Sequence, residues 1–314
     1  MQAITLRQFG GPENFQVGEL PMPTLRDSQL LVKVKAFSIN RADVLQRMGR
    51  YPAPPGEPDT LGLELAGEVV STGTNVSDWK AGERVFGIVG GGAYAQYCCI
   101  DAGSAMRIPA SLPFSTAAAI PEAFLTAYQC LRFHGELGRS GKAETVLIHA
   151  GASGVGTSAI QLVKLFNPQN KVIVTAGSEE KLDACRALGA DVGINYKKGS
   201  FASEVLSASP KGVDILLDFV GGNYFNDNMK CMGMDGRWVV IGLLGGGKLP
   251  EGADMSAILR NRIKIIGTTL RSRSNEYKTH LTQEFVRECM AAIEAGTMKP
   301  LVHHVSPWRG GGEG

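Results

Sequence analysis

Hydrophobic positions in the second half of the chain fall into short apolar runs separated by amphipathic segments. The apolar runs, which we expect to be strands, occupy residues 146–150, 171–176, 192–196, 214–220, 238–243 and 263–269. The segments between them show helical periodicity at 155–166, 179–188, 201–208, 223–232 and 254–261. Strands that are apolar on both faces and alternate with helices form a parallel sheet covered on both sides. The pattern therefore predicts an α/β domain of the Rossmann type, a doubly wound parallel sheet, over residues 124–270.

Residues 1–123 have a different pattern, in which short alternating runs are interrupted by glycine and proline. The runs read LLVKVKAFSIN, LELAGEVVSTG, ERVFGIV and AYAQYCCI, and helical periodicity is scarce among them. Such runs predict a compact β-rich domain. Prolines concentrated in residues 51–60 make that loop stiff, which suits the wall of a cleft.

Length and composition are those of an ordinary globular protein with two domains. The 314 residues are too many for one ordinary core, and 20% charged with 44% hydrophobic residues excludes a largely disordered chain. A formal net charge of +2 gives no reason to expect nucleic acid or an acidic membrane as a partner. Scattered cysteines without a C-x-x-C pair predict neither a disulfide framework nor a zinc cluster. The N-terminus lacks a signal-peptide core, so we expect a cytoplasmic location.

A glycine-rich loop follows the first predicted strand of the second domain. It reads HAGASGVGTSAIQL, and its glycines do not form the G-x-G-x-x-G fingerprint. Standing alone, such a loop also occurs as a tight turn between a strand and a helix, although less often than as a nucleotide site. Its place after a buried strand and before an amphipathic helix favours a pyrophosphate site, because the first amides of a helix attract anions. We expect Ser153 to add a hydroxyl donor there.

The end of the second predicted strand, in the stretch VTAGSEEK, distinguishes between the two nicotinamide dinucleotides. An NAD site places a carboxylate here for the ribose hydroxyl, whereas an NADP site must accept a phosphate. Gly177 leaves room, Ser178 supplies a hydroxyl, and Lys181 follows one helical turn later. Tyr196, at the end of the third strand, could add its phenol. The two glutamates after Ser178 would oppose a phosphate, but first-turn acids suit the helix dipole and can face solvent. The stretch therefore predicts NADPH.

Four longer motifs identify a family: GASGVG, NRADVLQRMGRYPAPPG, LGLELAG and IPEAFLTAYQCL. With them the chain resembles the medium-chain dehydrogenase/reductase superfamily over residues 1 to about 305. It is most similar to the zinc-free quinone oxidoreductase branch, and within it to the NADPH-dependent type that a tumour suppressor induces in animals. The resemblance implies a GroES-like catalytic domain, completed by part of 271–314, a Rossmann cofactor domain, and a cleft between them. It also implies homodimers joined through the strand at 263–269.

The same resemblance implies contacts with the cofactor at particular positions. Asn40 and Tyr51 would line the wall beside the nicotinamide, and Tyr51 is the candidate to bond the acceptor oxygen or deliver a proton to it. The segments 243–245 and 269–271 would hold the carboxamide through backbone groups. The implied cofactor-binding residues are Asn40, Tyr51, Thr126, Ser153, Gly154, Val155, Gly156, Ser178, Lys181, Tyr196, Val220, Leu243, Leu244, Gly245, Thr269, Leu270 and Arg271.

No metal site is expected. Zinc-dependent members of the superfamily use a cysteine and the histidine of a G-H-E motif. Here the second motif reads Gly62-Leu63-Glu64 and the first has Ala42 in NRADV, so three protein ligands cannot be assembled. His303 and His304 are adjacent and late in the chain, which favours a surface or packing role.

Three functions are compatible with these residues. Without a metal to stabilise an alkoxide, a quinone or other conjugated carbonyl is an easier acceptor than an alcohol, which favours an NADPH-dependent quinone oxidoreductase. An enoyl or other alkene reductase would use the same cofactor wall. A non-catalytic NADPH-binding protein, structural or RNA-binding, is the third alternative, and the charge balance argues against it.

The C-terminus departs from the family. Relatives continue beyond LVHHV with a helix and a strand, whereas this chain reads SPWRGGGEG. We expect the tail at 306–314 to be disordered. An unpaired sheet edge and uncovered apolar surface would follow, with weak NADPH binding or aggregation.

Overall fold

A computed structural model describes residues 1–308, which form two compact units. Unit 1 comprises Met1–Leu125 together with the chain from Leu270 onward, and unit 2 comprises Thr126–Thr269. Residues 306–308 have no regular secondary structure, and the rest of the predicted tail, 309–314, lies outside the described residues. Within the described part of the chain, no helix has the length and apolar character needed to cross a bilayer.

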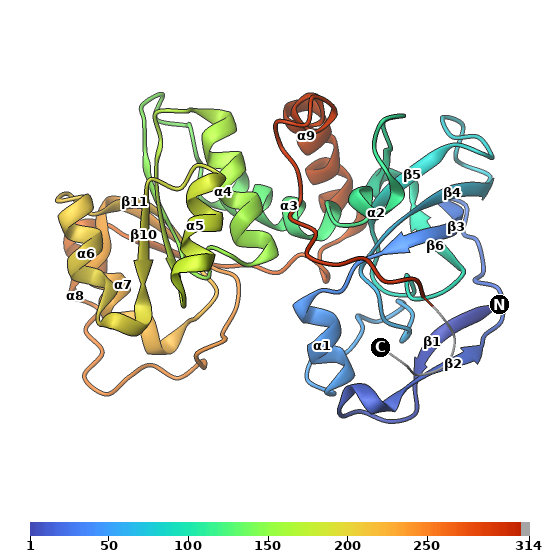
Figure 1. Cartoon of the computed structure of the whole chain (residues 1–314), viewed down its shortest axis with the longest axis horizontal. Helices are drawn as coiled ribbons and strands as arrows, with labels where there is room; N and C mark the ends of the chain where they lie inside the picture. The colour runs from blue at the N-terminus through green and yellow to red at the C-terminus, as the bar shows by residue number, and fades with distance from the viewer. Residues whose placement is uncertain (309–314) are drawn as a thin grey trace. The chain divides into compact units, whose positions relative to one another are not determined.

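Unit 1 contains an antiparallel sheet with the strand order β6-β3-β4-β5-β7 and a separate hairpin of β1 and β2 (Figure 1). Its core is built from inward-facing residues such as Leu30, Val32 and Leu65. The four alternating runs of the sequence form β3 to β6, which confirms the predicted GroES-like, β-rich architecture. The strands are β1 (Gln2–Leu6), β2 (Phe15–Glu19), β3 (Gln29–Phe37), β4 (Glu64–Thr72), β5 (Arg84–Ile88), β6 (Tyr97–Asp101) and β7 (Ala105–Arg107).

Unit 1 also carries a long helix, α9 (Asn275–Glu294), which the sequence patterns did not predict. Ser274 caps it, because its hydroxyl accepts a hydrogen bond from the Tyr277 amide at 3.3 Å. Leu281 and Phe285 lie one turn apart on its buried face, and Phe285 packs on Phe124 with ring centres 6.4 Å apart. The shorter helices are α1 (Arg41–Arg47), α2 (Phe114–Ala117) and α3 (Pro121–Tyr128), the last of which continues into unit 2.

Unit 2 is a six-stranded parallel sheet with the order β10-β9-β8-β11-β12-β13. This is the strand order of a doubly wound dinucleotide-binding sheet, so the predicted Rossmann-type fold is confirmed. In Figure 1, α4 and α5 lie on one face of the sheet and α6, α7 and α8 on the other. The strands are β8 (Thr145–Ile148), β9 (Lys171–Ala176), β10 (Val192–Asn195), β11 (Val213–Asp218), β12 (Met232–Val240) and β13 (Lys264–Gly267). The helices are α4 (Gly154–Phe166), α5 (Glu179–Ala187), α6 (Phe201–Ala208), α7 (Phe225–Cys231) and α8 (Ser256–Asn261).

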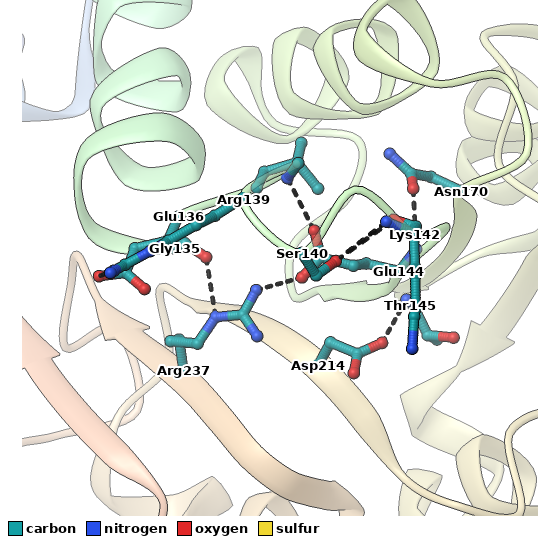
Figure 2. A network of polar contacts seen from close by, with 12 residues as sticks. Gly135, Glu136, Arg139, Ser140, Lys142, Glu144, Thr145, Asn170, Asp214 and Arg237 are labelled. Atoms are coloured by element: carbon teal, nitrogen blue, oxygen red, sulfur yellow. Dashed lines mark hydrogen bonds and ion pairs between the residues drawn. The ribbon is translucent and has the colours of Figure 1, made fainter.

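A buried ion pair fixes the loop that leads into β8 (Figure 2). The Arg237 guanidinium on β12 pairs with Glu144, and its Nε donates to the Gly135 carbonyl at 2.9 Å. The second Glu144 oxygen accepts from the Gly138 amide at 2.7 Å. Glu144 is only 6% exposed, so each of these bonds forms away from water. The network therefore ties residues 135–144 to the sheet.

Candidate active site

The glycine loop of unit 2 builds an anion-binding helix start. Ser153 is the N-cap of α4, and its hydroxyl accepts from the Gly156 amide at 3.0 Å. A Cβ at Gly156 would lie 2.5 Å from the Ala150 carbonyl oxygen, so only glycine allows this close turn. The amides of Gly154 and Val155 belong to the first turn and have no intrahelical acceptor. This geometry suits a pyrophosphate.

Three residues predicted to bind the 2′-phosphate come together beyond the carboxyl ends of β9 and β10. A Cβ at Gly177 would lie 2.8 Å from the Tyr196 hydroxyl, so the phenol adjoins this turn. Ser178 caps α5 and accepts from the Lys181 amide at 3.4 Å. Tyr196 does not end the strand as predicted: β10 stops at Asn195, and Tyr196 opens a 3₁₀ turn that carries its ring outward. No carboxylate ends β9.

Lys197 is a cation at this edge that sequence reasoning missed. Its Cε would lie 3.2 Å from a Cβ on Gly177, beside the Tyr196 hydroxyl. The side chain is exposed, and no ion pair to it forms within residues 1–308. The signal in the sequence was the pair of lysines that directly follows Tyr196.

Glu179, one of the two glutamates expected to oppose a phosphate, is paired with neighbouring cations. Glu179 bonds the Lys198 ammonium at 2.9 Å and lies 3.7 Å from Arg186. The hydrogen bond and charge of Lys198 lower the pKa of Glu179. Glu179 is therefore engaged with its own cations on the exposed surface.

Most of the remaining predicted positions of unit 2 lie on loops, and Thr126 lies on a helix. Val220 was expected to end a strand, but β11 stops at Asp218, whose carboxylate accepts from the Val220 amide at 2.7 Å. The Gly245 amide donates to the Val220 carbonyl at 2.8 Å, which joins the two predicted loops, and Leu243 and Leu244 are exposed beside them. Thr269 likewise follows β13 rather than ending it, since β13 stops at Gly267. Thr126, on α3, is buried.

In unit 1, two carboxylates hold Asn40. The residue precedes α1, and its backbone amide donates to Asp43 Oδ2 at 2.8 Å. Its side-chain Nδ2 donates to Glu64 Oε1 at 2.7 Å. The other Asp43 oxygen accepts from the Gly62 amide at 3.0 Å. The position and orientation of the Asn40 amide are thus fixed from two sides.

Glu64, which is buried, and Glu122, which is half-buried, are two neighbouring acids that the sequence analysis did not predict. Glu64 is 1% exposed and accepts from the Ser38 hydroxyl, from Asn40 and from the Glu122 amide at 2.8 Å. Burial, with a smaller contribution from Asp43, raises the pKa of Glu64 to about 7. Burial, followed by the charges of Glu64 and Asp43, raises the pKa of Glu122 to about 8. The signal in the sequence was an acid inside each of two apolar stretches, LGLELAG and IPEAF.

Arg271 and Tyr51 lie beside this pair. The Arg271 side chain is 5% exposed, and its Nε donates to the Gly90 carbonyl at 2.8 Å. Its Cζ lies 5.5 Å from the centre of the Tyr51 ring. Burial raises the pKa of Tyr51, opposed by the charge of Arg271. Arg271 was predicted to act through its backbone, whereas the structure buries its guanidinium in the site; Leu270 beside it is also buried.

A dinucleotide-binding sheet joined to a β-rich unit with buried acids defines a dehydrogenase or reductase. Residues 26–110 match the family model described as "Alcohol dehydrogenase GroES-like domain", and residues 154–287 match "Zinc-binding dehydrogenase". The rat quinone oxidoreductase is 32% identical over 306 residues, which cover 96% of this chain and 89% of that protein. The chain belongs to the medium-chain dehydrogenase/reductase superfamily and, within it, to the quinone oxidoreductase family; it is an oxidoreductase.

Solved structures show the same likeness. The Escherichia coli quinone oxidoreductase complexed with NADPH has a TM-score of 0.81 at 29% identity, covering 95% of this chain and 89% of that one. The CurK enoyl reductase has a TM-score of 0.82 at 24% identity, covering 96% and 90%. That second likeness shows the shared fold alone.

The described residues do not fit the zinc that one family description implies. Asn40 offers an amide, and Leu63 is a buried hydrocarbon with no lone pair. Nowhere in residues 1–308 do three or more His, Cys, Asp or Glu side chains gather as a metal would require. No step of the chemistry below is routed through a metal.

Proposed function

We propose that this protein is an NADPH-dependent quinone oxidoreductase that works without zinc. The observation that carries the proposal is the 2′-phosphate edge of unit 2: Gly177, Ser178, Lys181, Tyr196 and Lys197 gather where an NAD site would have an acid. The relatives named above, a quinone oxidoreductase from rat and one from E. coli solved with NADPH, support the same activity.

The cofactor supplies the hydride, and the chain supplies binding and orientation. The Gly154 and Val155 amides, with the Ser153 hydroxyl, would hold the pyrophosphate. Lys181 and Lys197 would neutralise the 2′-phosphate. The loops at 220 and 243–245, with 269–271, would fix the carboxamide, and Thr126 would contact the cofactor from α3.

A conjugated carbonyl acceptor suits the residues of unit 1. Such an acceptor delocalises the incoming charge, so donors and orientation can replace a Lewis acid. Tyr51 is our candidate donor to the acceptor oxygen, and burial keeps its phenol protonated by raising its pKa. Asn40, fixed by its two carboxylates, would form the wall beside the nicotinamide.

An alkene reductase on the same scaffold is the second candidate, because the CurK enoyl reductase shares this fold. The non-catalytic, RNA-binding alternative gains no support from the net charge of +2. The discriminating experiment is a steady-state panel of NADPH oxidation with ortho-quinones, para-quinones, enones and enoyl thioesters. We expect turnover with quinones to exceed turnover with the other acceptors. Preference for enoyl thioesters would establish the alternative.

We further propose a homodimer formed through β13 and a cytoplasmic location. β13 is the last strand in the sheet order, so no strand among residues 1–308 pairs with its outer edge, and Ile265 on it is an exposed apolar side chain. Light scattering behind size-exclusion chromatography tests the dimer, and Ile265→Lys should convert it to a monomer. A wild-type monomer would contradict this part of the proposal, and cell fractionation tests the location.

A further inference from the structure

The ionisable side chains of unit 1 form what we call the buried charge cluster: Asp43, Glu64, Glu122, Arg271 and Lys278. They come from α1, β4, α3, the segment after β13, and α9. Burial lowers the pKa of both Arg271 and Lys278, since their charged forms lose water. Keeping five ionisable groups out of water is costly, and sites that do so are commonly functional.

Arg271 has hydrogen-bond donors that no residue in the range 1–308 accepts. Its Nε is bonded to Gly90, but Nη1 and Nη2 are buried and have no acceptor among the described residues. Leaving the donors of a charged group unbonded in a protein interior is costly, because those donors lose their hydrogen bonds to water and gain none in return. An oxygen from outside the chain is therefore the missing partner.

Glu122 is the complementary group. Its backbone amide is bonded to Glu64, but within residues 1–308 its carboxyl oxygens accept no hydrogen bond. The residue as a whole is half-buried, whereas Glu64 is buried. The Arg271 Cζ lies 5.5 Å from the centre of the Tyr51 ring, and the charges of Arg271 and Glu122 both act on the pKa of the Tyr51 phenol.

Building on the proposed quinone reductase activity, we propose that Arg271 and Glu122 together receive the carbonyl oxygen of the acceptor. Arg271 donates hydrogen bonds to that oxygen as it gains negative charge, and Glu122 gives it a proton. Tyr51 then keeps the hydrogen bond to the acceptor proposed above, and the proton itself comes from Glu122.

The step balances without any further reactant. The hydride from NADPH brings two electrons and one hydrogen to the acceptor, and the negatively charged oxygen takes its hydrogen as a proton from Glu122. The O–H bond of Glu122 breaks while an O–H bond forms on the acceptor. Water returns one proton to the Glu122 carboxylate, so each turnover consumes one NADPH and one proton.

The surroundings of Glu122 keep its proton in place near neutral pH. Burial acts most strongly, and the negative charges of Glu64 and Asp43 add to it. The positive charges of Arg271 and Lys278 oppose it, and Tyr51 also faces the group. The balance holds the pKa of Glu122 at about 8, near the value that suits a general acid at physiological pH.

The test compares Glu122→Gln with the wild type in quinone reduction between pH 6 and about 10. The wild-type kcat should fall as pH rises through the pKa of Glu122. Glu122→Gln should lower kcat about 10²–10⁴-fold at neutral pH and abolish that descending limb. Glu122→Asp, which keeps a carboxyl, should retain the limb, and Glu294→Gln on the exposed end of α9 should change neither quantity.

Arg271→Met should lower kcat with quinones about 10²–10³-fold, and Arg271→Lys should recover part of the loss.

NADPH affinity, measured by fluorescence titration, should stay within about threefold of wild type in both Glu122 variants, which separates proton delivery from cofactor binding. Thermal unfolding checks that each variant is folded. If Glu122→Gln does not fold, the test rests on Glu122→Asp, in which the descending limb of the pH–rate profile should be displaced from its wild-type pH.

Wild-type kcat and an unchanged limb in Glu122→Gln would overturn the inference while leaving the proposed function intact. A Glu122→Gln variant that loses NADPH affinity but keeps the wild-type kcat would also overturn the inference. If the wild type binds NADPH but reduces no quinone, the proposed function itself fails.

Discussion

Each unit of this protein buries an arginine beside carboxylates, and the two arrangements differ in how completely they are bonded. In unit 2, Arg237 is bonded to Gly135 and Glu144, and Glu144 also accepts from Gly138 (Figure 2). In unit 1, Arg271 keeps two guanidinium nitrogens without an acceptor among residues 1–308. The carboxyl of Glu122, beside it, has no donor in that same range.

The difference separates a structural role from a functional one. A buried ion pair in which no fully buried nitrogen lacks an acceptor, as with Arg237 among the described residues, holds chain segments in one geometry. A buried charge with unused donors raises the free energy of the empty site and lowers it again when an acceptor binds. We therefore assign the first network to the fold and the second to chemistry.

The largest expected effect comes from a substitution that breaks the ion pair between Arg237 and Glu144. Arg237→Met leaves Glu144 buried without its cation, which should lower the free energy of unfolding by about 3–5 kcal/mol. Urea denaturation followed by circular dichroism measures this. Lys230→Met, which removes a surface ion pair to Asp227, is the matched control and should cost less than about 1 kcal/mol. Equal losses in the two variants would remove the contrast between the networks.

A second prediction uses the raised pKa of Glu122. The folded chain holds this proton up to about pH 8, whereas the unfolded chain releases it near the ordinary value of 4.5. The stability from the protonated carboxyl is thus complete below pH 4.5 and is lost as pH rises through about 8. Relative to the wild type, Glu122→Gln should therefore gain about 4 kcal/mol of unfolding free energy between pH 5 and 9. A constant difference in unfolding free energy across that range would contradict the shift.

The lysines of unit 2 differ in a similar way, namely in whether they have an ion-pair partner. Lys198 is paired with Glu179, whereas Lys197 has no ion-pair partner in the described chain. Lys197→Ala and Lys181→Ala should each raise the KM for NADPH about 10- to 100-fold, equivalent to about 1.5–3 kcal/mol, with little change for NADH. Lys198→Ala, the control, should change the KM for NADPH less than either. Equal effects on both nicotinamides would refute the phosphate site.

The smallest expected effect concerns a helix cap. Ser274→Ala removes the hydroxyl that accepts from the Tyr277 amide at the start of α9. The free energy of unfolding should fall by about 1 kcal/mol. Lys278, on the first turns of that helix, belongs to the buried charge cluster, so the descending limb of the pH–rate profile should shift slightly as well. An unchanged unfolding midpoint would show that α9 does not depend on this cap.

Much of unit 2 could be predicted because its signals are local. A buried parallel strand is a continuous apolar run, and the glycine loop and Ser178 lie next to such runs in the sequence. The helix α9 was missed because its buried positions, including Leu281 and Phe285, are embedded in a polar stretch. The buried charge cluster could not be found from local patterns, because Asp43, Glu64, Glu122 and Arg271 are brought together only by the fold of unit 1. Lys197 was missed because an exposed lysine is ordinarily only a solvated residue.

The most direct test of the account is calorimetric titration of the wild-type protein with NADP⁺ and with NAD⁺ under identical conditions. We predict at least about tenfold tighter binding of NADP⁺, with the difference abolished in a Lys181→Ala, Lys197→Ala double variant. Equal affinities in the wild type would contradict the account.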